Sequence, residues 1–412
     1  MENKTNWRDE ELSITEVMAK YPEVSPFIII KTDAQRRGVH FTDAALKKVD
    51  PQIHQTQSRS FALEKTDLTP FSLLMRDGTS ILTGDVRVQG AREPLIVDVI
   101  DDKIMICDEG KPLEEVFYWE KPDFYNKTTS SGKPMWHIAW ARPQRIDINP
   151  NQFCQFWQTP GHGCKYCAIA ATYKKSGKPQ FVNLDDIEET VQEALKQPGR
   201  YTSIFLTGGT ILDGKELLDD EVNLYIDILK RIGKNFGGKR FPSQLIGTAF
   251  NKNQLQRLHD ETGLMSYTAD IEVLNDELFQ WICPGKAARI GYQEWKERLF
   301  QAVDIFGRGY VNTGLVAGVE LAKPNGFTSE EKALERVLEE AEDFAKNGVS
   351  PVGCVWTVAP GSVFFRQKTP SLEYYVRLSK GFDELRRKYN ISIDMDNYRR
   401  CGNHPDTDLS RI

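Results

Sequence analysis

The sequence lacks the features of a membrane or secreted protein. No apolar run in its 412 residues approaches the roughly eighteen that a bilayer-spanning helix needs. The first 23 residues are too polar for a signal peptide. Seven cysteines in a chain of this length do not form the dense framework of a disulfide-stabilised secreted domain. These absences predict a cytoplasmic protein without a membrane span, in which clustered cysteines bind metal or take part in chemistry.

The chain also has little net charge, no internal repeat and no low-complexity tract. A formal net charge of -6 argues against a surface built to hold phosphate backbones, so nucleic acid is not an expected partner. Hydrophobic residues make up 40% of the sequence and charged residues 27%, which is the balance of a globular protein with a substantial core.

From residue 145 onward, strand-like and helix-like segments alternate with some regularity. The strand-like segments are 145–149, 201–209, 243–250, 264–273, 310–320 and 349–358. A series of six βα units implies a parallel sheet, because each crossover between parallel strands needs a helix that covers one face. The pattern by itself leaves a partly closed barrel and an open sheet as alternatives.

Residues 1–144 have a different pattern, which predicts a small α+β domain. The segment 25–49 is largely helical in character, whereas 79–90 and 94–110 alternate as strands. Asp101 and Asp102 lie at an expected hairpin turn within the last of these segments.

Three cysteines lie together in "CQFWQTPGHGCKYCAI", directly after the first strand. Cys154, Cys164 and Cys167 are separated by nine and by two residues. Three thiolates suit a [4Fe–4S] cluster in which one iron lacks a protein ligand, whereas a structural zinc site normally takes four ligands. A bare iron can be chelated by a small molecule, and the carboxyl end of a strand is where α/β proteins bind ligands. The alternative is a zinc ion with His162 or Cys401 as its fourth ligand.

The cysteine loop resembles the cluster motif of the radical S-adenosylmethionine (SAM) superfamily. Its final "CKYC" has Tyr166 just before the last cysteine, a position that commonly lies near the adenine in that family. The usual motif has three residues between the first two cysteines; nine is similar to the spacing in the Elongator catalytic subunit, whose acetyltransferase domain has no obvious counterpart here. The resemblance implies a partial (β/α)6 barrel of TIM type over residues 145–390. Residues 1–144 would form the additional domain, and 391–412 a tail near the barrel mouth.

The second strand ends in the glycine pair of "LTGG". This segment resembles the family motif that receives the amino group of SAM, where backbone groups must approach the ligand closely. The resemblance assigns SAM contacts to Thr207, Gly208, Gly209 and Thr210, with Thr210 where many members carry glutamate. The alternative is an ordinary turn at the end of a strand.

The fourth strand ends in "YTADIEVLND", where Asp270 and Glu272 share one face because side chains alternate along a strand. Polar residues at this place in the family bind the ribose hydroxyls or the methionine end of SAM. The segment "IEVLND" also resembles one in the biotin synthase and hydrogenase-maturase group, which makes Glu272 the first candidate and Asn275 a further one. The alternative is that these side chains merely end a strand and begin a helix.

Two later segments resemble those that surround the adenine in the same group. They are "GLVAGVE", which contributes Val316, and "VAPGS", which contributes Val358. The alternative for both valines is an ordinary place in a buried strand.

The sequence says less about the residues that would contact a substrate. Lys286 and Arg289 could hold a carboxylate or a phosphate, or could belong to a solvated helix start. Cys401 could donate a hydrogen atom, bind a ligand or have no role. Cys401 and Glu272 are therefore the catalytic candidates.

The resemblance implies an oxygen-sensitive radical SAM enzyme. An electron from a reduced flavodoxin or ferredoxin would reach the cluster and cleave SAM to methionine and a 5′-deoxyadenosyl radical, which would take hydrogen from a small-molecule substrate. Rearrangement, cleavage or bond formation is the expected outcome. Alternatives are methyl or sulfur transfer, including transfer to RNA, and, in another class, a zinc-stabilised binding module.

Overall fold

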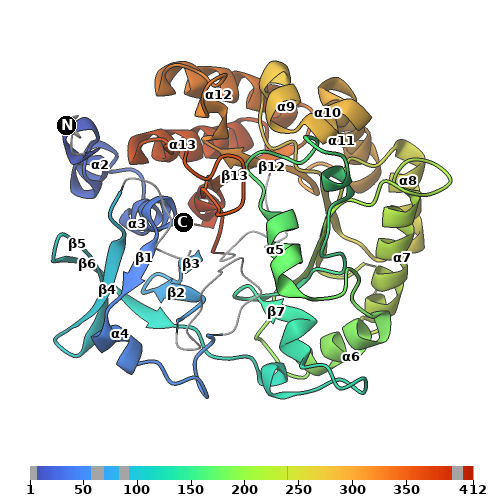
Figure 1. Ribbon diagram of the computed structural model, residues 1–412, viewed down its shortest axis with the longest axis horizontal. Coiled ribbons are helices and arrows are strands. Elements are labelled where there is room, and N and C mark those ends of the chain that lie inside the picture. The colour runs from blue at the N-terminus through green and yellow to red at the C-terminus, as the bar shows by residue number, and fades with distance from the viewer. Residues whose placement is uncertain (1–6, 57–68, 83–91, 239, 392–401, 412) are drawn as a thin grey trace.

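A computed structural model describes residues 7–56, 69–82, 92–238, 240–391 and 402–411. Two sheets organise these residues, one with six strands and one with seven, and each has its own apolar core (Figure 1). The seven-stranded sheet has the order β13-β12-β11-β10-β9-β8-β7.

The larger sheet contains six parallel strands in chain order, as the sequence predicts. They are β8 (Arg145–Ile148), β9 (Ser203–Thr207), β10 (Ser243–Ile246), β11 (Ser266–Thr268), β12 (Val311–Ala317) and β13 (Ser350–Val355). A short antiparallel strand, β7 (Ala139–Ala141), pairs with β8. Because β13 and β7 are the two ends of the sheet, the barrel is partial, and the predicted fold class is confirmed.

Helices follow the strands and form an arc around the sheet (Figure 1). They are α5 (Ile169–Ser176), α6 (Leu184–Ala194), α7 (Asp219–Gly233), α8 (Lys252–Glu261), α9 (Asp276–Ile282), α10 (Pro284–Arg289), α11 (Tyr292–Phe306), α12 (Glu330–Lys346) and α13 (Leu372–Lys388). Single turns of 3-10 helix occur at η2 (Asp123–Asn126), η3 (Met135–His137), η4 (Gln155–Gln158) and η5 (Val319–Leu321). No helix in the described residues is both long and apolar enough to cross a membrane.

The two faces of the larger sheet differ in polarity. Ile204, Leu245 and Leu315 belong to the apolar core that the helices cover. Neighbouring residues point to the opposite face, because side chains alternate along a strand. On that face the side chain of Gln244 accepts a hydrogen bond from Arg145 at 3.0 Å and donates one to Thr268 at 2.9 Å. The inner face of the barrel is therefore polar.

The amino-terminal domain is a mixed sheet with helices, as predicted. Its helices are α1 (Trp7–Glu10), α2 (Ile14–Lys20), α3 (Pro26–Arg37) and α4 (Asp43–Lys47), and its strands are β1 (Val39–Phe41), β2 (Ser72–Met75), β3 (Ser80–Leu82), β4 (Leu95–Ile100), β5 (Lys103–Asp108) and β6 (Lys111–Tyr118). Asp101 and Asp102 have φ of 49° and 63° and form the predicted hairpin turn between β4 and β5. Most of the predicted strand at 79–90 lies outside the described residues.

The described carboxyl-terminal residues fold into α14 (Pro405–Asp408) and η6 (Leu409–Arg411). This segment lies between α3 and β13, close to the mark for the carboxyl terminus in Figure 1. Asp406 forms an ion pair of 2.8 Å with Arg386 of α13, and Asp408 forms one of 2.6 Å with Lys31 of α3. The carboxyl-terminal segment is thus attached to both parts of the fold.

Candidate active site

The cysteine loop begins at the carboxyl end of β8 and is tied to the end of β9. Gly209 N donates to the carbonyl of Asn151 at 3.0 Å, and the Asn151 side-chain amide donates back to the Gly209 carbonyl at 2.6 Å. Gln155 N donates to the Thr210 carbonyl at 2.9 Å. A Cβ on Gly209 would lie 2.3 Å from the carbonyl oxygen of Phe153. The second glycine of "LTGG" is therefore required for contact with the cysteine loop itself.

A second set of contacts fixes the loop to the junction of α9 and α10. Lys165 N donates to the Ile282 carbonyl, and Gly285 N donates to the His162 carbonyl, each at 2.9 Å. A Cβ on Gly285 would lie 2.5 Å from that same His162 oxygen. Backbone hydrogen bonds from two distant parts of the barrel thus determine the path of the loop.

The three thiols of the loop lie within electrostatic range of one another. Burial raises the pKa of Cys154 and of Cys167, and the neighbouring Cys164 raises both further. Cys164 differs, because a hydrogen bond from Cys283 and the nearby cation of Lys286 lower its pKa against the effect of burial. Cys283 is fully buried, and its position beside Cys164 is not evident from the sequence.

A charged pair lies beside these thiols at the end of the fourth parallel strand. Lys286 Nζ is 2.7 Å from Glu272 Oε1 and 2.6 Å from the carbonyl oxygen of Asp270. The Asp270 carboxylate accepts a hydrogen bond of 2.7 Å from Gly314 N, while burial and the nearby Glu272 raise the pKa of Asp270 to about 7. Lys286 is only 8% exposed, so the interpretation as a solvated helix start is wrong for this residue.

The residues present fit an iron–sulfur cluster in their donor chemistry. Three thiols lie on one anchored loop, with Cys164 buried and Cys154 and Cys167 partly exposed, and a cation close to Cys164 favours the thiolate form that binds iron. In the described ranges no three His, Cys, Asp or Glu side chains already converge on one point as metal ligands.

The other residues predicted to contact SAM have varied surroundings. The Tyr166 hydroxyl lies close to Cys164 and Glu272. The Asn275 side chain caps α9 by accepting a hydrogen bond of 2.9 Å from Leu278 N. Val316 is partly exposed and Val358 is buried. Cys401 lies outside the described residues.

Glu221 is a buried carboxylate near the site that the sequence analysis did not identify. From α7 it accepts hydrogen bonds of 2.9 Å from Ile211 N and Thr248 N, and the Thr248 hydroxyl contacts that of Thr210 at 2.8 Å. Burial raises the pKa of Glu221 to about 7. From the sequence, only the place of this acidic residue on the apolar face of α7 could have indicated that Glu221 is buried.

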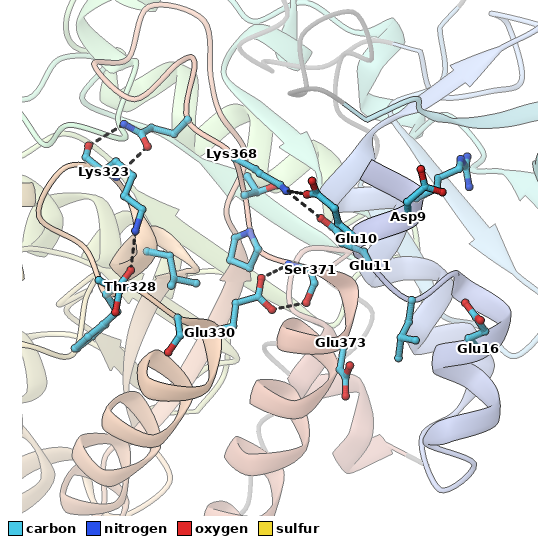
Figure 2. A pocket seen from close by; sticks show the side chains of 18 residues that line it. Asp9, Glu10, Glu11, Glu16, Lys323, Thr328, Glu330, Lys368, Ser371 and Glu373 are labelled. Atoms are coloured by element: carbon cyan, nitrogen blue, oxygen red, sulfur yellow. Dashed lines mark hydrogen bonds and ion pairs between the residues drawn. The ribbon is translucent and has the colours of Figure 1, made fainter. Parts of the chain in front are cut away.

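A polar cleft of about 750 Å³ lies elsewhere, between α1, α2 and the segments that precede α12 and α13 (Figure 2). Several of its acidic side chains already have partners. Lys368 Nζ lies 2.9 Å from Glu10 Oε2, and Glu330 accepts a hydrogen bond of 2.7 Å from Ser371 N. Since no residue of the cysteine loop lines this cleft, it is separate from the candidate active site.

Comparisons with known proteins match a large part of the barrel to a known family. The family model "Radical SAM superfamily" matches residues 155–318, which include Cys164, Cys167 and the strands from β9 to β12. Among curated proteins, bacteriochlorophyllide c C-7(1)-hydroxylase from Chlorobaculum limnaeum is 24% identical over 343 residues, which cover 79% of this chain and 80% of that protein. Residues 155–318 of the chain thus match the radical SAM superfamily, whose enzymes use a [4Fe–4S] cluster and SAM.

Two solved structures match this chain at low similarity. HydG, a maturase of the [FeFe]-hydrogenase, has a TM-score of 0.42 and 13% identity, and the alignment covers 63% of this chain. This chain spans about half of HydG, 52% of its length. A radical SAM methyltransferase from Sphaerobacter thermophilus has a TM-score of 0.41 and 17% identity over 68% of this chain and 76% of that one.

Proposed function

We propose that Cys154, Cys164 and Cys167 hold the cluster and leave one iron for SAM. The bound cluster supplies one-electron cleavage of SAM, fed by a flavodoxin or ferredoxin, and so provides a 5′-deoxyadenosyl radical that takes hydrogen from a small-molecule substrate. Rearrangement, cleavage or bond formation of that substrate is the proposed outcome. The main support is the grouping of three thiols on one loop that is tied to the end of β9 and to α10.

Residues around the loop have proposed roles in binding SAM. The backbone groups of Gly209 already bond to the cysteine loop. Thr207 and Gly208 are proposed to contact the amino group of SAM. Glu272 is proposed to bind the ribose hydroxyls or the methionine end, with Lys286 holding its carboxylate in place.

The proposal assigns the remaining predicted contacts by position. Val316 and Val358 would pack on the adenine, and Tyr166 would lie beside it. Asp270 and Thr210 would support the neighbouring SAM-binding residues rather than contact SAM through their side chains. The Asp270 carboxylate already accepts a hydrogen bond from the β12 backbone, and the Thr210 hydroxyl already bonds to another side chain. Asn275 is the weakest candidate, because its side chain caps α9.

Hydroxylation of a bacteriochlorophyllide is a second candidate function. It is supported by the relation to bacteriochlorophyllide c C-7(1)-hydroxylase, which extends over 79% of this chain rather than over the cluster region alone. Bacteriochlorophyllides are therefore the first substrates to test.

The test is anaerobic incubation of the reconstituted protein with SAM and a reductant, with 5′-deoxyadenosine measured as product. We expect the nucleoside from the wild type and from Cys107→Ala, which alters a buried thiol in the other domain, and none from Cys164→Ala. A bacteriochlorophyllide is then added and the products are analysed by mass. An intact cluster without any nucleoside product would contradict the proposed function.

A further inference from the structure

Cys354 lies on β13, on the inner face of the barrel. Its neighbours Gly353 and Val355 line a small space on the helix side of the sheet together with Phe382 of α13. Because side chains alternate along a strand, the Cys354 side chain points the opposite way, into the barrel. Cys354 is partly exposed and forms no disulfide.

Two side chains of the carboxyl-terminal segment contact this thiol. Cys354 Sγ lies 2.9 Å from His404 Nε2, and Asn403 Nδ2 donates to the same sulfur at 2.9 Å. Burial lowers the pKa of His404 to about 3, even though Asp406 opposes this shift. A neutral imidazole with an unprotonated Nε2 accepts a hydrogen bond from a thiol, and the 2.9 Å contact fits an S–H group bonded to His404 in that tautomer.

The carboxyl-terminal segment is held firmly where it meets β13. Gly353 N donates to Asp406 Oδ1 at 3.2 Å, while Arg386 pairs with the other oxygen of Asp406 at 2.8 Å. The Lys31–Asp408 pair, with both side chains fully buried, joins the segment to α3. His404 and Asn403 are therefore in a fixed position relative to Cys354.

The thiol lies close to the proposed SAM site through adjacent strands. Cys354 is the register partner of Val316 on β12, and Leu315 forms a bridge with Glu272, which is near Cys164. Neighbouring strands are about 4.8 Å apart, so two strand spacings place Cys354 roughly 10 Å from Glu272. A nucleoside bound across β12 would extend toward Cys354.

We propose that Cys354 is a catalytic hydrogen-atom donor inside the barrel, with His404 and Asn403 as positioning residues. A carbon-centred radical takes the thiol hydrogen, so that a C–H bond forms, the S–H bond breaks and a thiyl radical remains. One electron from a low-potential protein reductant and one proton, passed through His404, restore the thiol. This inference rests on the proposed function, and it favours reactions that end with hydrogen returned to the substrate rather than with hydroxylation.

The first test needs no substrate. Wild-type enzyme is incubated in D₂O with SAM and dithionite, which stands in for the protein reductant, and deuterium is measured per molecule of 5′-deoxyadenosine. The deuterated Cys354 thiol should label the nucleoside, Cys354→Ser should lose the label, and Cys107→Ser should retain it. His404→Ala should lower the labelling, whereas His404→Gln, which keeps a hydrogen-bond acceptor, should restore part of it.

The second test uses the chain without its cluster, so it does not depend on turnover. The infrared S–H stretch that disappears in Cys354→Ser should lie at the lower frequency of a hydrogen-bonded thiol and should shift upward in His404→Ala. An unshifted band would overturn the pairing, and 5′-deoxyadenosine labelled equally in wild type and Cys354→Ser would overturn the inference alone. Absence of the nucleoside from every variant would overturn the proposed function and this inference with it.

Discussion

Replacement of Lys286 by methionine removes the cation of the mostly buried Lys286–Glu272 ion pair. The Lys286 and Glu272 side chains are 11% and 14% exposed, so solvent screens the 2.7 Å pair only weakly. Nζ also lies over the ring of Trp295, 4.7 Å from its centroid. Methionine keeps most of the side-chain length but leaves the Glu272 carboxylate without its cation.

The structure gives the size of the expected effect. Removal of one partner from a buried ion pair costs about 3–5 kcal/mol, and we expect about 3 kcal/mol here because neither side chain is fully buried. For a domain of the barrel's size, each kcal/mol lowers the melting midpoint by about 2–4 °C. Lys286→Met should therefore melt roughly 6–12 °C below the wild type.

Thermal melting at neutral pH of the chain without cluster is a suitable assay. The matched control is Lys48→Met, which breaks an exposed pair with Asp102 and should melt close to the wild type. The double variant Lys286→Met with Glu272→Gln should recover part of the loss, because no buried charge is left without a partner. The reasoning would be refuted if Lys286→Met had the same melting midpoint as the control. It would also be refuted if the effects of the two changes at the pair were additive.

Three further changes test other parts of the site. Gly209→Ala places a Cβ 2.3 Å from the Phe153 carbonyl oxygen, so the loop must shift and the iron content of the folded protein should fall. Asn275→Ala removes the cap of α9 and should cost about 1 kcal/mol in urea unfolding; a large loss of SAM affinity in a binding titration would instead favour a ligand role. Burial raises the pKa of Glu221 from 4.5 to about 7, so its stabilisation is complete below pH 4.5 and is lost as the pH rises through 7. This loss is about 3 kcal/mol, and Glu221→Gln should therefore show a smaller fall in unfolding free energy between pH 5 and pH 8.

The order of strands in the barrel could be predicted from the sequence, because local signals carry it. The segment that forms β9 has apolar residues at its centre and is followed by a pair of glycines, and a helical pattern follows each strand-like segment. The polar inner face is not a local property. Arg145 and Gln244 are nearly 100 positions apart, and their side chains meet because β8 and β10 both pair with β9.

The cysteine loop could be identified because its ligands are close in sequence, whereas its surroundings could not. Cys283 and Lys286 reach Cys164 from the junction of α9 and α10, more than 100 positions along the chain. His404 reaches Cys354 from the last residues. No spacing rule covers such pairs, since loop lengths and helix packing determine which side chains meet.

Metal and sulfide analysis of the anaerobically reconstituted protein tests the central claim most directly. We predict about four iron and four sulfide ions per chain in the wild type, with both lost in Cys154→Ala, Cys164→Ala and Cys167→Ala. Iron should be retained in Cys283→Ala, because this thiol contacts Cys164 but is not a proposed ligand. A single zinc ion without sulfide, or loss of the metal in Cys283→Ala as in the other three variants, would contradict the account.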